Sequence, residues 1–221
     1  MRYSNVVRAS FAERLNRFEA YVDLDGVRTL VHVKNTGRCR ELLLPSSTVI
    51  LEKASNPARK TAYDLVAVYK EGFGLINMDS QAPNKVVAEW LSNQGYSYIK
   101  PEYTYGSSRI DFYMEKDGKK YLMEVKGCTL EVDGVGYFPD APTQRGVKHL
   151  EELIKAAMEG YHASIAFVIQ MKGIEKVYPN RAMQSEFGET MDRARAAGVK
   201  VLGLCCEVEE DGMSIIKCVE I

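Results

Sequence analysis

Residues 108–126 read SRIDFYMEKDGKKYLMEVK, and their pattern predicts a β-hairpin. The Asp117-Gly118 pair is a favoured two-residue turn between antiparallel strands. The register that this turn sets places Asp111 directly opposite Glu124, and the alternation of side chains along a strand puts Lys126 on the same face. Apolar residues alternate with these charges, so the opposite face of the hairpin is expected to be buried.

Asp111 and Glu124 would repel each other across the hairpin, because like charges in paired strand positions are destabilising. A hard cation such as Mg²⁺ or Mn²⁺ would compensate, since it favours one or two carboxylates together with water and phosphate oxygens. Lys126 could position or deprotonate an attacking water, or offset charge on a phosphate. We therefore predict Asp111, Glu124 and Lys126 as catalytic residues, with the two carboxylates as metal ligands and with Glu102 and Glu89 as weaker third carboxylates. The alternative is a solvated edge hairpin with scattered charges.

Downstream of the hairpin, the apolar spacing predicts a helix over residues 143–159, with Thr143 as its N-cap. Arg145 and Lys148 lie off the apolar stripe of this helix. They are candidates for phosphate binding beside the metal, and the alternative is an ordinary solvated face. His149 fits a hydrogen-bonding group that supports the metal ligands better than it fits a ligand.

The rest of the chain divides into two patterns. Strand-like segments separated by Gly, Pro, Ser and Asn run through the first 80 residues and predict a small all-β barrel or sandwich. From Pro83 the period becomes helical, with Asn84 as a plausible N-cap, and the expected order is helix, three strands, helix, strand, helix, strand. We therefore predict a mixed α/β domain at 83–221 after a β domain at 1–82.

Composition limits the classes of function. The 221 residues are 46% hydrophobic with a net charge of -1, so a core is expected and the overall charge favours neither nucleic acid nor an anionic membrane. Residues 1–60 hold 11 Lys and Arg against 6 Asp and Glu, which concentrates basic charge at that end. No signal-peptide core or membrane-spanning segment is found, so we expect a cytoplasmic protein without a membrane partner. The five cysteines lack a CxxC pair, and no nucleotide-binding glycine motif supports a sugar-handling enzyme.

Eight segments carry a resemblance to a known family: Arg14–Phe18, Asn35–Arg38, Asn56–Thr61, Pro83–Asn84, Gly106–Phe112, Glu124–Lys126, Phe138–Ala141 and Arg145–Leu150. Over essentially its whole length, the sequence resembles the sugar fermentation stimulation protein A (SfsA) family. The resemblance implies an N-terminal OB-like barrel followed by a restriction-endonuclease-like α/β domain of the PD-(D/E)XK type. In that pattern Asp111 and Glu124 would be metal ligands and Lys126 the catalytic lysine.

The resemblance also implies DNA binding without strong sequence preference. An OB face binds single strands through a cationic groove and aromatic stacking, and the predicted DNA-binding residues of the barrel are Arg14, Arg17, Phe18, Arg38, Arg59 and Lys60. The alternative is that Phe18 lies in the core and the arginines hold the barrel to the second domain. The predicted function is DNA binding with a Mg²⁺-dependent phosphodiesterase (nuclease) site. Its alternative is a non-catalytic, sequence-nonspecific DNA-binding regulator linked to sugar (maltose) metabolism.

Overall fold

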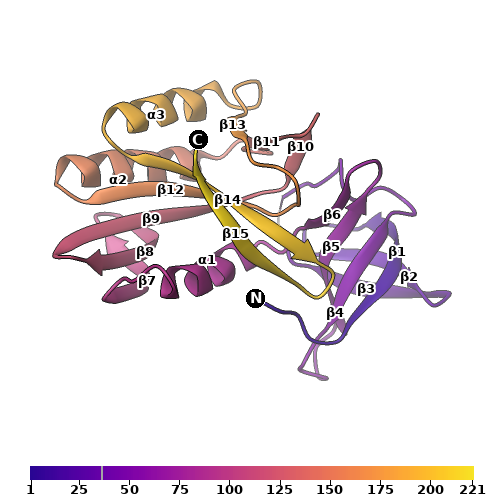
Figure 1. The fold of residues 1–221 in the computed structure, drawn as a ribbon. Coiled ribbons are helices and arrows are strands. Elements are labelled where there is room, and N and C mark those ends of the chain that lie inside the picture. Colours follow the sequence, from indigo (N-terminus) through magenta and orange to yellow (C-terminus); the bar gives the residue numbers. More distant parts are fainter. Residues whose placement is uncertain (36) are drawn as a thin grey trace. The chain divides into compact units, whose positions relative to one another are not determined.

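The computed structural model describes residues 1–35 and 37–221, which form two compact units (Figure 1). Thr36, in the second of the family-like segments, lies outside the described residues. Unit 1 consists of Met1–Ala82, Gln170–Lys172 and Cys206–Ser214, and unit 2 of Pro83–Ile169, Gly173–Cys205 and Ile215–Ile221. Within the described ranges, no helix is long and apolar enough to cross a membrane.

Unit 1 contains an OB-like barrel, as the family resemblance predicts. Its sheet has the strand order β3-β2-β1-β4-β5-β6, and a parallel pairing between β3 and β5 closes the first five strands into a barrel. The strands are β1 (Val6–Arg14), β2 (Glu19–Leu24), β3 (Val27–Val33), β4 (Thr48–Lys53), β5 (Tyr63–Lys70) and β6 (Gly74–Asn77).

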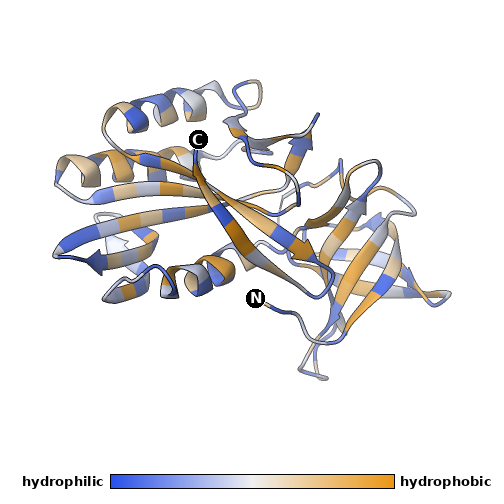
Figure 2. Cartoon of the chain, viewed as in Figure 1, coloured by the Kyte–Doolittle hydropathy of each residue, from blue (hydrophilic) through white to orange (hydrophobic). Residues whose placement is uncertain are grey.

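Local sequence explains most of the barrel. Ala20 and Val22 alternate with polar residues along β2 and are fully buried, and apolar residues recur along the barrel strands in Figure 2. The turn at Asp25-Gly26 has positive φ at both residues and joins β2 to β3 in a two-residue hairpin. Strand β1 was not among the predicted strands. Its pairing with β2 is irregular between Phe11 and Glu13, which interrupts the alternation that marks a strand.

Unit 2 is the expected mixed α/β domain. Its six-stranded sheet has the order β15-β14-β12-β9-β8-β7, in which β12 pairs parallel with both β9 and β14. Figure 1 shows α2 and α3 on one side of this sheet and α1 on the other. A small sheet of β10, β11 and β13, which the sequence analysis did not predict, completes the unit.

The bounds of the remaining elements follow in chain order. They are α1 (Ala82–Ser92), β7 (Tyr98–Tyr105), β8 (Ser108–Lys116), β9 (Lys119–Cys128), β10 (Leu130–Val132), β11 (Val135–Phe138), α2 (Gln144–Met158), β12 (His162–Ile169), β13 (Val177–Pro179), α3 (Ser185–Ala196), β14 (Lys200–Glu209) and β15 (Gly212–Glu220).

The starts of the first two helices test the predicted caps. In α2, Thr143 is the N-cap, and its hydroxyl accepts a hydrogen bond of 3.0 Å from the Gly146 N–H, as predicted. In α1 the prediction is wrong, because the helix begins at Ala82 and Asn84 lies in its first turn. The Asp79 carbonyl accepts from the Ala82 N–H at this end of the helix. The Asn84 side chain therefore serves another contact.

Candidate functional site

The β8–β9 hairpin has the predicted turn and register. Asp117 and Gly118 both have positive φ, and the ladder runs from the pair Lys116–Lys119 to the pair Phe112–Met123. Asp111 and Glu124 occupy the next position along this register. Their side chains therefore lie at the end of the paired part of the hairpin.

Asp111 is held at this position by two hydrogen bonds. Its Oδ2 accepts from the Val125 N–H at 2.8 Å, and its Oδ1 accepts from the Asn84 side-chain amide at 2.7 Å. Burial, and then the negative charge of Glu124, raise the pKa of Asp111 above its ordinary value. The two carboxylates are thus electrostatically coupled, and the local partners of Asp111 offset only part of that cost.

Glu124 is almost fully buried, and its two carboxylate oxygens differ in their hydrogen-bond partners. Its Oε1 accepts from Lys126 Nζ at 2.6 Å and also contacts Nδ1 of His149. Its Oε2 has no hydrogen-bond partner among the described residues. Burial alone would raise the pKa of Glu124, but the contacts with His149 and Lys126 lower it overall. Glu124 is therefore ionised at neutral pH, with one buried oxygen left unsatisfied.

A chain of contacts connects this carboxylate to helix α2. Arg145 Nε donates to His149 Nε2 at 3.3 Å, so in the neutral ring the proton lies on Nδ1, which faces Glu124. His149 thus contacts the carboxylate directly and supports it, as a hydrogen-bonding group would. Among the described residues, the other N–H groups of the exposed Arg145 have no hydrogen-bond partner, so they are available to a ligand.

The other charged residues considered near the hairpin lie at the protein surface. Lys148 is exposed, and its Nζ donates to the Ser107 carbonyl at 3.3 Å. Glu102 forms an exposed ion pair with Arg109, and Glu89 is exposed on α1. Across residues 1–35 and 37–221, no group of three or more His, Cys, Asp and Glu side chains is arranged to hold a metal. A cation at this hairpin would therefore rely on the Asp111 and Glu124 pair, and Mg²⁺ needs no more than one or two carboxylates.

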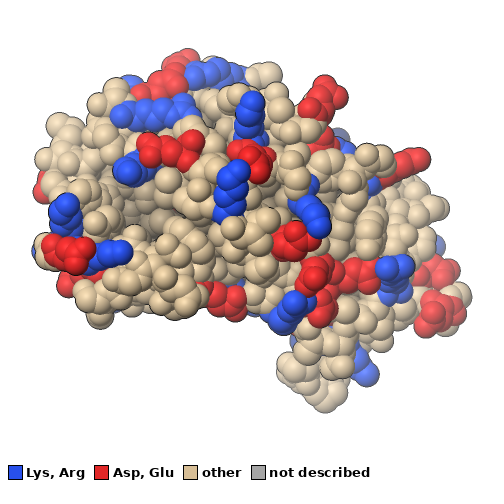
Figure 3. Space-filling view, in the orientation of Figure 1, with Lys and Arg blue, Asp and Glu red and all other residues tan. Residues whose placement is uncertain are grey.

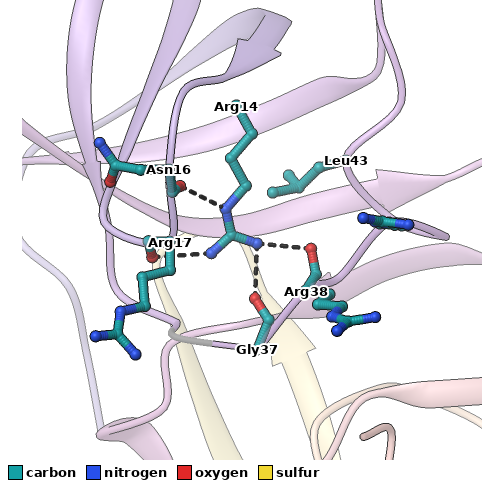
Figure 4. A pocket seen from close by; sticks show the side chains of 7 residues that line it. Arg14, Asn16, Arg17, Gly37, Arg38 and Leu43 are labelled. Carbon is teal, nitrogen blue, oxygen red and sulfur yellow. Dashed lines mark hydrogen bonds between the residues drawn. The ribbon is translucent and has the colours of Figure 1, made fainter.

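The barrel carries a second group of predicted residues around one pocket (Figure 4). Arg14 reaches into it, and all five guanidinium N–H groups donate to backbone carbonyls within 3.1 Å. The acceptors are the carbonyls of Asn16, Arg17, Asn35, Gly37 and Arg38. Because a guanidinium has five N–H groups, none is left for phosphate, and the predicted DNA contact of Arg14 becomes a positioning role.

An adjoining pocket shares Asn16 and Arg17 with the first. Its lining includes four of the predicted residues, Arg17, Phe18, Arg59 and Lys60. The Arg17 guanidinium lies 5.0 Å from the centre of the Phe18 ring, and that ring is 44% exposed, so Phe18 is not a core residue. Arg59 makes a two-pronged ion pair with Asp64, whereas Lys60 forms an exposed pair with Glu19. The predicted barrel residues therefore lie together around two adjoining pockets.

Comparison with known proteins matches two family models to successive parts of the chain. The model described as "SfsA N-terminal OB domain" matches residues 12–78. The model described as "Sugar fermentation stimulation protein RE domain" matches residues 81–212. The chain belongs to the sugar fermentation stimulation protein family.

Members of this family resemble the chain over nearly its full length. The "Sugar fermentation stimulation protein homolog" of Clostridium beijerinckii is 50% identical and covers 97% of this chain and 96% of its own. The homolog of Desulfitobacterium hafniense is 52% identical, over 96% and 94%. A solved structure of the Pyrococcus furiosus SfsA protein in complex with Ca²⁺ has a TM-score of 0.85 and 26% identity, covering 100% of this chain and 95% of its own.

The sequence analysis missed two residues of these sites. Asn84 holds Asp111, and its only signal was the family-like pair Pro83–Asn84. Arg40 lines the Arg14 pocket with Arg17 and Arg38, and its spacing two residues from Arg38 was the available signal. On the face shown in Figure 3, Lys and Arg are interspersed with Asp and Glu, in keeping with the net charge of -1.

Proposed function

We propose that this protein binds DNA and hydrolyses its phosphodiester backbone with a divalent cation held by Asp111 and Glu124. The observation that carries this proposal is the buried Oε2 of Glu124, which lacks a partner among the described residues beside a second carboxylate. Buried polar atoms are almost always satisfied, so an unsatisfied carboxylate oxygen in a paired site fits the role of a cation ligand. The Ca²⁺ complex of the Pyrococcus furiosus protein supports a cation in this family.

The donor set of the site fits such a cation. Mg²⁺ or Mn²⁺ bound here would polarise a phosphate oxygen and favour deprotonation of water. Asn84 and the Val125 N–H would keep the Asp111 carboxylate in place. Lys126, 2.6 Å from Glu124, would orient water or offset charge on the phosphate. Arg145 and Lys148, both exposed on α2, would hold the DNA backbone.

The second candidate is a non-catalytic, sequence-nonspecific DNA-binding regulator linked to sugar (maltose) metabolism. One observation favours it: Lys126 and His149 already contact Glu124 and offset its charge without a cation. A site of this kind can persist as a binding surface after catalysis is lost. The name of the family agrees with such a role.

A cleavage assay separates the two functions. Purified protein is incubated with single- and double-stranded DNA and Mg²⁺ or Mn²⁺, alongside Asp111→Ala and the matched control Glu189→Ala, which removes an exposed carboxylate from α3. We expect cleavage by the wild type and by Glu189→Ala, and none by Asp111→Ala. Salt-sensitive DNA binding without cleavage under either metal would favour the regulator instead.

Cation binding is measured independently of activity by thermal unfolding. A cation that binds only the folded state stabilises it by about 2.7 kcal/mol at a hundred times its Kd. We expect Mn²⁺ to raise the unfolding temperature of the wild type and of Glu189→Ala but not that of Asp111→Ala. Equal shifts in all three proteins would place the cation elsewhere.

A further inference from the structure

The arginine pocket of unit 1 is a concave site rich in positive charge. It has a volume of about 280 Å³ and is lined by Arg14, Asn16, Arg17, Gly37, Arg38, Arg40 and Leu43. Four of these residues are arginines and none is acidic. Such a lining favours an anion and disfavours a cation or a neutral ligand.

Arg14 gives this pocket a fixed shape. Its five N–H groups bind carbonyls on both segments that form the walls, and Figure 4 shows the guanidinium directed at Gly37, with Arg17 and Arg38 on either side. Two side chains stiffen the same segments: the Asn16 side chain accepts from the Phe18 N–H, and the Asn35 side chain accepts from the Gly37 N–H. The carbonyl oxygens that would repel an anion are therefore bound to Arg14 and held in place.

The other three arginines remain available to a ligand. Arg38 and Arg40 are exposed on either side of Cys39, which is buried and whose carbonyl accepts from the N–H groups of Leu42 and Leu43. Arg17 is exposed on the opposite segment. In the described part of the chain, no carboxylate forms an ion pair with Arg17, Arg38 or Arg40. Three guanidinium groups in one small pocket thus lack a counter-charge.

We propose that this pocket binds a phosphate monoester. A terminal phosphate carries nearly two negative charges and three free oxygens on one substituent, which suits several arginine forks in a small concave site. A phosphodiester within a strand has a single negative charge and is linked to a nucleotide on each side. The volume of about 280 Å³ lies just below the usual range for ligand pockets, which suits a phosphate and the group next to it.

The monoester has two possible sources, a nucleic-acid strand end and a small phosphorylated metabolite. The adjoining pocket favours the strand end. This pocket shares Arg17 with the arginine pocket and is also lined by the exposed ring of Phe18, on which a neighbouring base could stack. The strand-end source rests on the proposed DNA-binding function, whereas binding of the phosphate group does not.

The test uses the full chain without divalent cations, so that DNA stays intact. Fluorescence anisotropy compares oligonucleotides of one sequence that end in a 5′-phosphate, a 3′-phosphate or hydroxyl groups only. Calorimetry measures inorganic phosphate and a nucleoside monophosphate. The variants are Arg38→Ala and Arg40→Ala, with Lys53→Ala as a control that removes a positive charge from β4 outside the pocket.

We expect one of the phosphorylated oligonucleotides to bind at least about tenfold more tightly than the hydroxyl form. Arg38→Ala and Arg40→Ala should lose this preference while Lys53→Ala keeps it. Arg14→Lys should also lose it, because three ammonium N–H groups cannot replace five, and unfolding curves would check that this variant folds.

The remaining outcomes separate the two proposals. In one outcome the three oligonucleotides bind equally well, whereas inorganic phosphate or the nucleoside monophosphate binds the wild type and no longer binds Arg40→Ala. The pocket then serves a small phosphorylated ligand. If no DNA binds but phosphate does, the proposed function fails and the pocket stands. If neither the phosphorylated ends nor the small phosphates depend on Arg38 and Arg40, the pocket proposal is overturned, whatever the affinity for DNA.

Discussion

Each unit contains a buried carboxylate surrounded by cationic groups, and the two differ in how completely the carboxylate is satisfied. In unit 1, both oxygens of Asp64 are bound by Arg59, at 2.6 and 3.0 Å. His32 lies 3.0 Å from one oxygen and Lys34 3.5 Å from the other. Burial alone would raise the pKa of Asp64, but these partners lower it below its ordinary value.

In unit 2 the partners are similar but the result is not. Lys126 and His149 both meet Oε1 of Glu124, and Oε2 is left without a described partner. Asp111, beside it, has a raised pKa. The Asp64 cluster is thus satisfied by protein groups alone, whereas under the proposed function the Asp111 and Glu124 pair would be completed by a ligand that supplies positive charge.

The largest expected effect is on cleavage. Glu124→Gln removes a charge that would bind the cation, and changes to groups that merely support metal ligands already cost up to about a hundredfold. We therefore expect a loss of at least about a hundredfold in the rate of DNA cleavage, measured under single-turnover conditions. DNA affinity without metal should be unchanged or higher, because a carboxylate near phosphate is gone. Cleavage at the wild-type rate would show that the metal site is assigned to the wrong residues.

The next effect is on stability. Replacing the aspartate should lower the free energy of unfolding more in the Asp64 cluster than at the Asp111 and Glu124 pair. Asp64→Asn places an amide against Arg59 and leaves this partly buried cation without its counter-charge, whereas Lys34 keeps Glu52 and Asp79 as partners, so we expect a loss of about 2 kcal/mol in the free energy of unfolding. Asp111→Asn loses one hydrogen bond but relieves the repulsion from Glu124, so it should change stability by less than about 1 kcal/mol. Urea denaturation measures both. Equal losses would mean that the two clusters are alike.

Local patterns were sufficient for the hairpin and for α2. The turn at Asp117-Gly118 set the register, and Thr143 capped its helix as predicted, because both signals involve residues close in sequence. The β-barrel was also expected, but the parallel pairing of β3 with β5 that closes it joins His32 to Asp64 and leaves no local periodicity. The family resemblance supplied that closure as an expectation.

The partners of the charged residues could not be predicted in the same way. Arginine can bind phosphate or backbone carbonyls, and only the folded positions show that Arg14 uses all five N–H groups internally. Asn84 was predicted as an N-cap because asparagine favours that position, but the helix begins at Ala82, so Asn84 lies in its first turn and the Asn84 side-chain amide donates to Asp111. Residue types narrowed the candidates, and long-range packing chose among them.

A smaller effect is the contribution of Asp64 to the dependence of stability on pH. Because its folded pKa is lowered, this carboxylate stabilises the protein above the unfolded pKa of about 3.9, and the contribution is lost as the pH falls through the lower folded pKa. The difference in stability between wild type and Asp64→Asn should therefore begin to shrink below about pH 4 and continue to shrink until the pH falls below the folded pKa of Asp64. Unfolding curves at a series of pH values measure the difference, and a gap that stays constant to low pH would contradict the assigned role of Asp64.

The smallest effect on stability should come from Lys60, the neighbour of Arg59. Its side chain is largely exposed, and its ion pair with Glu19 is at the surface, where such pairs contribute little. Lys60→Ala should therefore unfold like the wild type, yet reduce the magnitude of the salt dependence of DNA affinity by about one on duplex DNA, because one phosphate contact is lost. Arg59→Ala would lower stability as well, since Arg59 is bound to Asp64. Affinity measured from low to high salt distinguishes the two, and an unchanged slope in Lys60→Ala would remove this residue from the DNA-binding surface while leaving the Asp64 cluster as described.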